Sequence, residues 1–98
     1  MTQDNSIADG SANDTGNDSG TIALQALVWV LQDGPRTDRL LGLTGLTGDQ
    51  LRQRIMEPAI HLAVLDYLMG YEPDLIACAQ ALDLPLTRMV QAHTSLSS

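Results

Sequence analysis

Several residue types are absent or scarce in this sequence, and each shortage excludes a kind of chemistry. The chain has no lysine, because all five of its basic residues are arginine. This excludes a P-loop nucleotide site, Schiff-base formation and a lysine nucleophile. The single cysteine, Cys78, cannot form an internal disulfide, and two histidines are too few for a self-contained zinc site. We therefore expect neither a metal nor a cofactor.

Long apolar runs are missing as well. The longest near-continuous apolar stretch, Ile22 to Leu31, is too short to cross a bilayer, and the N-terminus lacks the basic and apolar segments of a secretory signal. Twelve acidic residues against five arginines give the 98-residue chain a formal net charge of −7. These features are typical of a small, acidic, soluble protein, which we expect in the cytoplasm and away from membranes.

Composition divides the chain into two parts. Residues 1–20 are dominated by Asn, Asp, Ser, Gly and Thr, and they contain too few apolar residues to offset the entropy of ordering. Half of residues 21–98 are apolar, which is enough for the core of a small, marginally stable domain. The sequence therefore predicts a disordered acidic tail over residues 1–20 and one helical domain over residues 21–98.

Apolar residues after position 20 recur at helical spacing, and no segment alternates as a strand does. Each of the four prolines precedes an apolar-periodic stretch, as a proline in the first helical turn does. Thr47 and Gln50 have the spacing of a capping box, while Gly34, Gly45 and Gly70 are suited to end helices. The pattern predicts an all-α, compact bundle of five to six short helices, near residues 21–32, 35–44, 47–56, 58–69, 73–82 and 85–95.

Two of the predicted helices, 21–32 and 58–69, are apolar on almost every side. Helices of this kind are enclosed by others, so we expect them at the centre with Trp29 buried against the second of them. A shift of 38 residues superposes the two helices and places Pro35 on Pro73, which suggests two pseudo-symmetric units of three helices. Coincidence among leucine-rich helices explains this match equally well.

The region from Ile22 to Val90 resembles a known family. The matching segments are IALQALVWVL, LLGLTGLTGDQLRQRIMEPAIHLAVLDYLM and LIACAQALDLPLTRMV, with an LTGL turn at Leu43 to Leu46 and a VLDYL core at Val64 to Leu68. They are similar to a family of short alphaproteobacterial proteins catalogued only as a domain of unknown function. The resemblance implies a small, helical, non-secreted protein, and it assigns no activity, ligand or catalytic residue.

Asp66 is the first candidate for a functional residue. It lies mid-helix among apolar residues, where a carboxylate either faces a solvent gap or accepts hydrogen bonds from a neighbour. Acid or base catalysis needs a second ionisable group, and His61, five residues away, is poorly spaced to supply it. A structural role for Asp66 is therefore favoured. His61 shares a helical face with Glu57, a spacing that is compatible with a surface hydrogen bond between them and indicates no further role.

Gly42, Gly45 and Gly48 form the segment GLTGLTG ahead of a predicted helix. Glycine-rich turns before helix N-termini can present backbone amides to phosphate. The spacing is not that of the dinucleotide fingerprint, and no strand precedes the segment. A turn between two helices explains the three glycines more simply.

Cys78 lies between small apolar residues in the segment LIACAQAL, which is typical of a cysteine that fills a core. A reactive thiolate needs a cationic neighbour or a helix N-terminus, and neither is evident around it. His61 and His93 are far apart in the chain and have no local set of further ligands, which argues against a metal site.

Two segments, LLGLTGLTGDQLRQRI and IACAQALDLPLTRMVQA, have the shape of a helix–turn–helix motif. DNA binding needs several phosphate contacts from basic residues. The second helix of the later segment offers Arg88 alone, and that of the earlier one offers Arg52 and Arg54 beside Asp49. A lysine-free chain of charge −7 is a poor polyanion binder. We therefore expect no nucleic acid partner.

These observations favour a non-enzymatic helical module that binds an unidentified protein or a second copy of itself. One alternative is a helix–turn–helix-like accessory factor that binds nucleic acid, which an exposed row of arginines on a protruding helix would favour. A second alternative is a small enzyme or ligand carrier that uses Asp66. A pocket in which Asp66 and His61 converge would favour that alternative.

Overall fold

The computed structural model describes residues 19–97 and is all-helical over that range, which confirms the predicted fold class. Residues 1–18 of the expected disordered tail lie outside the described residues. Helix α1 includes Ser19 and Gly20, the last two residues of the range expected for the tail. The six helices are α1 (Ser19–Leu31), α2 (Gly34–Thr44), α3 (Gly48–Gln53), α4 (Pro58–Met69), α5 (Glu72–Ala81) and α6 (Leu86–Ser97).

The helix starts follow the local sequence closely. Helices α2, α4 and α5 each have a proline in the first two positions, where the missing N–H leaves no helical hydrogen bond unmade. The predicted capping box is confirmed before α3. There the Gln50 N–H donates to Thr47 Oγ1 over 3.1 Å, and the Thr47 N–H donates to Gln50 Oε1 over 3.0 Å.

Two helix ends use the left-handed backbone region. Gly45 ends α2 with a φ of +72°, and its N–H donates to Leu41 O over 2.8 Å. After α5 and its C-cap Leu82, Asp83 has a φ of +57°, and the Leu84 N–H donates to Ala79 O over 2.9 Å, which turns the chain into α6. The expectation that Gly34 stops the first helix is wrong. Gly34 begins α2, since capping by the Asp33 carboxylate sets the start of that helix.

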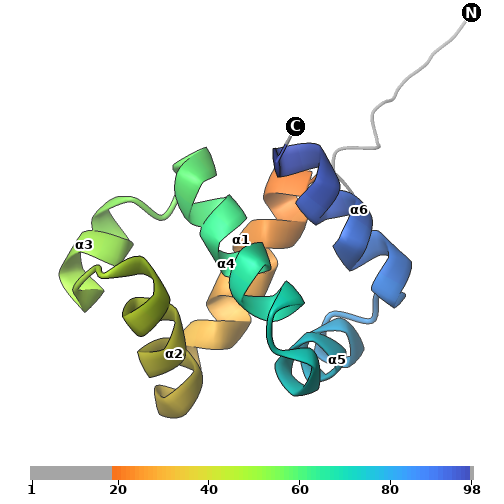
Figure 1. The fold of residues 1–98 in the computed structure, drawn as a ribbon, viewed down its shortest axis with the longest axis horizontal. Helices are drawn as coiled ribbons and strands as arrows, with labels where there is room; N and C mark the ends of the chain where they lie inside the picture. Colours follow the sequence, from red (N-terminus) through yellow and green to blue (C-terminus); the bar gives the residue numbers. More distant parts are fainter. Residues whose placement is uncertain (1–18, 98) are drawn as a thin grey trace, which may run out of the picture.

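The predicted central helices, α1 and α4, cross at the middle of the molecule, with α2 and α3 to one side and α5 and α6 to the other (Figure 1). Helix α6 packs against both of them, so the centre is a group of three helices. Trp29 is 9% exposed, which confirms its predicted burial. The largest fully buried side chains are Ile22, Leu27, Leu40, Leu51, Leu65, Leu68, Met89, Val30, Val64 and Cys78.

The third helices of the two suggested repeat units differ strongly. Helix α3 has six residues and one buried side chain, Leu51, and it ends three residues before the predicted end at position 56. Helix α6 has twelve residues and packs across the two central helices. The second helices, α2 and α5, correspond in their first-turn proline, but the third pair does not correspond.

Candidate functional site

A concave region lies between α1 and the C-terminal end of α5. It has a volume of about 620 Å³ and is lined by Leu24, Gln25, Val28, Trp29, Gln32, Ala81 and Leu82. None of these side chains carries a charge, and we call this region the neutral hollow. Val28 is 47% exposed within it.

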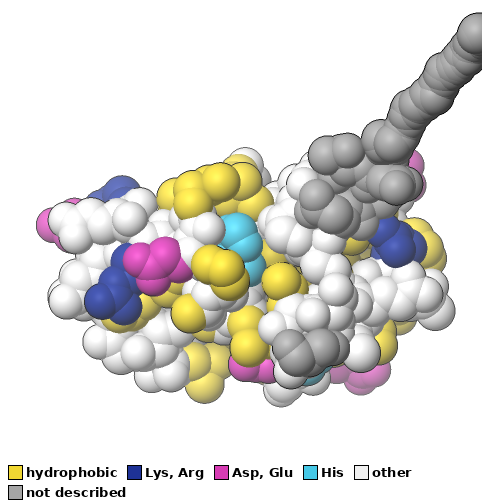
Figure 2. Space-filling model, turned by 90° about the horizontal axis from the view of Figure 1, so that it is seen from above, with side chains coloured by type: hydrophobic (Ala, Val, Ile, Leu, Met, Phe, Trp, Pro, Cys, Tyr) yellow, Lys and Arg dark blue, Asp and Glu magenta, His cyan; other side chains and the backbone are white. Residues whose placement is uncertain are grey.

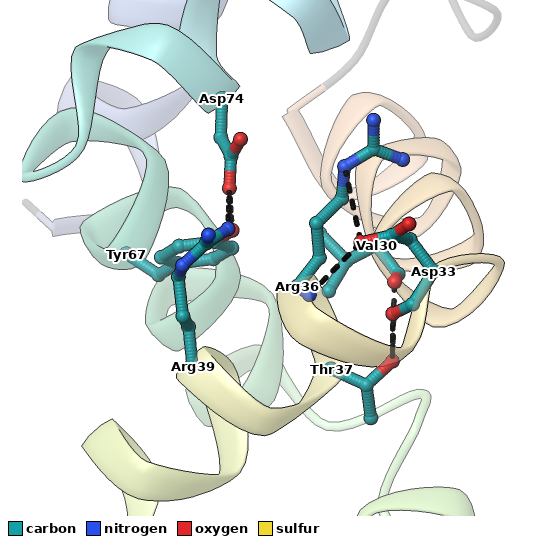
Figure 3. Close-up of polar contacts among 7 residues, drawn as sticks. All are labelled: Val30, Asp33, Arg36, Thr37, Arg39, Tyr67 and Asp74. Atoms are coloured by element: carbon teal, nitrogen blue, oxygen red, sulfur yellow. Dashed lines mark hydrogen bonds and ion pairs between the residues drawn. The ribbon is translucent and has the colours of Figure 1, made fainter.

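A network at the corner between α1 and α2 fixes the position of Trp29. The Arg36 guanidinium lies over the indole ring, 3.6 Å from its centroid, and the Arg36 N–H donates to Asp33 Oδ2 over 3.1 Å. Thr37 Oγ1 donates to Val30 O over 3.1 Å and so ties α2 to the last turn of α1 (Figure 3). The indole that lines the neutral hollow is therefore held in place without a ligand.

The second concave region lies between α2 and α4. It has a volume of about 430 Å³ and is lined by Arg39, Gly42, Leu43, Asp66, Tyr67, Gly70 and Tyr71. Because it contains a guanidinium, a carboxylate and two phenols, we call it the polar pocket.

Hydrophobic side chains also reach the surface between charged ones on the face of the molecule seen in Figure 2, where several surround a histidine.

One wall of the polar pocket is a cluster that joins three helices. Arg39 Nη1 on α2 lies 2.8 Å from Asp74 Oδ2 on α5, and the Tyr67 hydroxyl on α4 donates to the same oxygen (Figure 3). The Arg39 guanidinium also lies over the Tyr71 ring, 4.7 Å from its centroid. Asp74 is 13% exposed, so its charge is largely withdrawn from water and depends on these two partners.

Burial, followed by the hydrogen bond to Asp74, raises the pKa of Tyr67 to about 12. The phenol therefore stays protonated at neutral pH and acts as a hydrogen-bond donor. None of the sequence patterns pointed to this cluster, because Arg39 and Asp74 are 35 positions apart in the chain.

The ionisable partner of Asp66 is His93. His93 Nε2 on α6 lies 2.6 Å from Asp66 Oδ1 on α4, so the carboxylate accepts the hydrogen bond from the imidazole. The Asp66 side chain is 61% exposed at the edge of the polar pocket. Asp66 thus faces solvent and also accepts a hydrogen bond, the two situations that its sequence context predicted.

The suggested surface hydrogen bond between His61 and Glu57 is wrong. His61 is 7% exposed, and its Nε2 donates to the Ile55 carbonyl over 2.8 Å. It shares one face of α4 with Val64, Leu65 and Leu68, all of which are buried. That apolar stripe is visible in the sequence and was the signal for a buried histidine. Asp66 and His61 do not converge in a pocket, because they lie on different faces of α4.

The other candidate residues have structural positions. Cys78 is fully buried, and this burial raises the pKa of its thiol to about 12, which confirms it as a core residue. Gly45 forms the turn between α2 and α3, as expected. The expectation that all three glycines of GLTGLTG form a turn is wrong for Gly42 and Gly48, which lie within helices.

The arginines proposed for nucleic acid contacts lie on two different elements, Arg52 and Arg54 at the end of α3 and Arg88 on α6. Arg52 Nη1 on α3 lies 2.9 Å from Asp49 Oδ1, and Arg88 Nη1 on α6 donates to Gln91 Oε1 over 2.9 Å. Arg54 follows the last residue of α3. Between residues 19 and 97, no group of three or more His, Cys, Asp and Glu side chains could hold a metal ion. In the same range, no helix has the length and apolarity needed to cross a membrane.

Comparison with known proteins gives one match. The model of a family described as "Protein of unknown function (DUF3572)" matches residues 17–98. No curated protein and no solved structure matches the chain.

Proposed function

We propose that this chain, which belongs to the DUF3572 family of unknown function, is a non-enzymatic helical module that binds another protein through the neutral hollow. One observation carries the proposal. A concave region of about 620 Å³ without any charged lining residue, with Val28 47% exposed in it, lies on a chain of net charge −7. Water in contact with Val28 and Leu24 is released when a partner covers them, which favours association.

The rigidity of the hollow supports the same proposal. Trp29 and the end of α1 are already held by Arg36 and Thr37, so a partner does not have to order them on binding. Tryptophans in preformed, desolvated sites are frequent hot spots of protein interfaces. Gln25 and Gln32 flank Val28 at the edge of the hollow, where their amides can both donate and accept hydrogen bonds at a polar rim.

A comparison of two substitutions tests this function. Val28→Glu places a charge inside the hollow, and Val90→Glu places the same charge on α6 at a side chain of equal exposure, 47%. We expect a lysate of the native host, or the chain itself, to supply a partner that binds the wild type and Val90→Glu but not Val28→Glu. Equal binding by all three proteins contradicts the proposal, provided that circular dichroism shows the same helix content in each.

The polar pocket supports a second candidate function, a carrier of a small polar ligand. The supporting observation is that Asp66, held by His93, lines a pocket of about 430 Å³ together with Arg39 and Tyr71. A carboxylate and a guanidinium in one pocket suit a ligand with both an amine and an acid group. An NMR titration with small amino acids tests it. Shifts at the Gly42 and Gly70 amides that disappear in Asp66→Asn support a carrier, and unchanged spectra contradict it.

A further inference from the structure

We infer that the protein bound in the neutral hollow is a second copy of this chain, with the two α1 helices antiparallel about a twofold axis near Val28 and Trp29. This inference rests on the proposed function, because it names the partner for the same surface. Three properties of α1 support it: the distribution of charge, the order of the exposed side chains and the space beside them.

The distribution of charge favours a partner that is itself acidic. Helix α1 has no charged residue between Ser19 and Leu31, whereas each of the other five described helices has at least one. A basic partner gains free energy by facing carboxylates, and the neutral hollow offers none. A second copy carries the same net charge of −7, so it can approach closely only where carboxylates do not oppose one another.

The order of exposed side chains along α1 and the turn after it is self-complementary. Gln25 and Val28 lie three positions apart on one side of α1, and Gln32, just after the last residue of the helix, lines the same hollow. In an antiparallel pair centred between Val28 and Trp29, Gln25 of one copy lies opposite Gln32 of the other, and the reverse pair follows from symmetry. Each glutamine amide has two donor hydrogens and an acceptor oxygen, so both pairs can form hydrogen bonds across the axis.

The hollow also has room for the second copy. Ala81 and Leu82 form its other side, and the small, exposed Ala81 leaves space next to Val28. The hollow has a volume of about 620 Å³ and is open to solvent, so the face of a second helix can reach it. Val28 from the second copy can therefore enter each hollow, where it contacts Trp29 and Leu24 and removes their exposed atoms from water.

Sedimentation velocity of the full chain over about 1 µM to about 1 mM tests the self-association. We expect a concentration-dependent species of twice the 10.5 kDa chain mass. Val28→Glu should abolish it because two carboxylates then meet at the axis, while the matched control Val90→Glu should retain it. A dimer that persists in Val28→Glu overturns the inference, since its interface then lies elsewhere.

Charge exchange at the two glutamines tests the antiparallel arrangement. Gln25→Glu with Gln32→Arg places opposite charges across the axis, and we expect a dissociation constant at or below that of the wild type. Gln25→Glu with Gln32→Glu places carboxylates opposite one another, and we expect the dissociation constant to rise at least about tenfold. In a parallel pair both double variants bring like charges together, so weakening by both overturns the arrangement.

The failure of this inference and that of the proposed function give different results. A chain that remains monomeric at about 1 mM, yet captures a host protein that Val28→Glu loses, overturns self-association and supports binding of a different protein. A chain that neither dimerises nor shows any binding sensitive to Val28→Glu overturns both. Val28 is an exposed residue, so we expect Val28→Glu to remain folded. Melting curves of each variant, compared with the wild type, check that a loss of binding is not caused by unfolding.

Discussion

The neutral hollow and the polar pocket are both concave, but their polar groups have different partners. In the polar pocket, Arg39 and Asp66 are each joined to a residue on another helix, Asp74 on α5 and His93 on α6. In the neutral hollow, the lining has no charge to pair, and the aliphatic side chain of Val28 faces solvent. Each region exposes an aliphatic side chain, Leu43 in the polar pocket and Val28 in the neutral hollow, but only the polar pocket also has charges that pair between helices.

In the function proposed for this chain, the more charged of the two concave regions is not the binding surface. A surface ion pair that stays intact adds little free energy to ligand binding. A ligand that takes the place of one partner must break the pair, and the fold then loses the stabilisation that the pair supplied. Apolar surface next to an ordered indole has no such cost. The following predictions test the contrast, beginning with the largest expected effect.

Truncation of the indole should have the largest effect on stability. Trp29→Ala removes a side chain that contacts Arg36 and lines the neutral hollow, so we expect a loss of about 3–5 kcal/mol in the free energy of unfolding. For so small a domain this is enough to unfold much of the population. Urea denaturation followed by circular dichroism measures it, with Trp29→Phe as the milder control. A change below about 1 kcal/mol would falsify the assignment of Trp29 to the core.

Removal of one hydroxyl tests the polar pocket. Tyr67→Phe deletes the donor to Asp74, and a hydrogen bond to a charged group contributes about 1.5–3 kcal/mol, which we expect as the loss in unfolding free energy. Tyr71→Phe is the matched control, because it keeps the ring under the Arg39 guanidinium and should change stability by less than about 0.5 kcal/mol. Equal losses in the two variants would show that the Asp74 cluster does not stabilise the fold.

Alkaline pH should destabilise the protein through Cys78 and Tyr67. Burial raises the pKa of both groups to about 12, from ordinary values of 9.0 for Cys78 and 10.0 for Tyr67, so the folded chain retains protons that the unfolded chain releases. Stability is therefore unaffected by these groups below pH 9 and falls from pH 9 to pH 12, by at most about 1.4 kcal/mol per pH unit and group. Urea midpoints across this range measure the slope, which Cys78→Ala should reduce. An unchanged slope in that variant would count against the buried thiol.

The bond between Asp66 and His93 should contribute little, because the carboxylate is 61% exposed. We expect a coupling free energy of about 0.2–1 kcal/mol at pH 6, as for other exposed ion pairs. A double-mutant cycle with Asp66→Asn and His93→Gln measures it. A coupling above about 2 kcal/mol would show that the pair behaves as a buried one.

The smallest expected effect is on DNA. The chain has charge −7, and Arg52 lies beside Asp49, so we expect no binding of random duplex DNA at low micromolar protein in about 50 mM salt. Fluorescence anisotropy with labelled DNA measures it. Saturable, salt-sensitive binding that is lost with Arg52→Ala and Arg54→Ala, or with Arg88→Ala, would favour the helix–turn–helix alternative over protein binding.

Helix limits and caps were predictable because they depend on residues within one turn of each other. Pro58 and Met69 bound α4 as predicted, and the capping box at Thr47 forms with Gln50, three residues away. The burial of Trp29 followed from the all-round apolar character of its helix. The burial of His61 was predictable from the stripe that it continues, but its short distance from Glu57 in sequence led to the wrong partner.

The residues of both concavities come together only in the folded chain. Arg39 meets Asp74 and Asp66 meets His93 across 35 and 27 positions, and the neutral hollow joins α1 to the end of α5. Backbone hydrogen bonds and caps act between neighbours in the chain, so short sequence patterns determine them. Contacts between helices depend on where the helices cross and how they are rotated, and the packing of the whole core sets both.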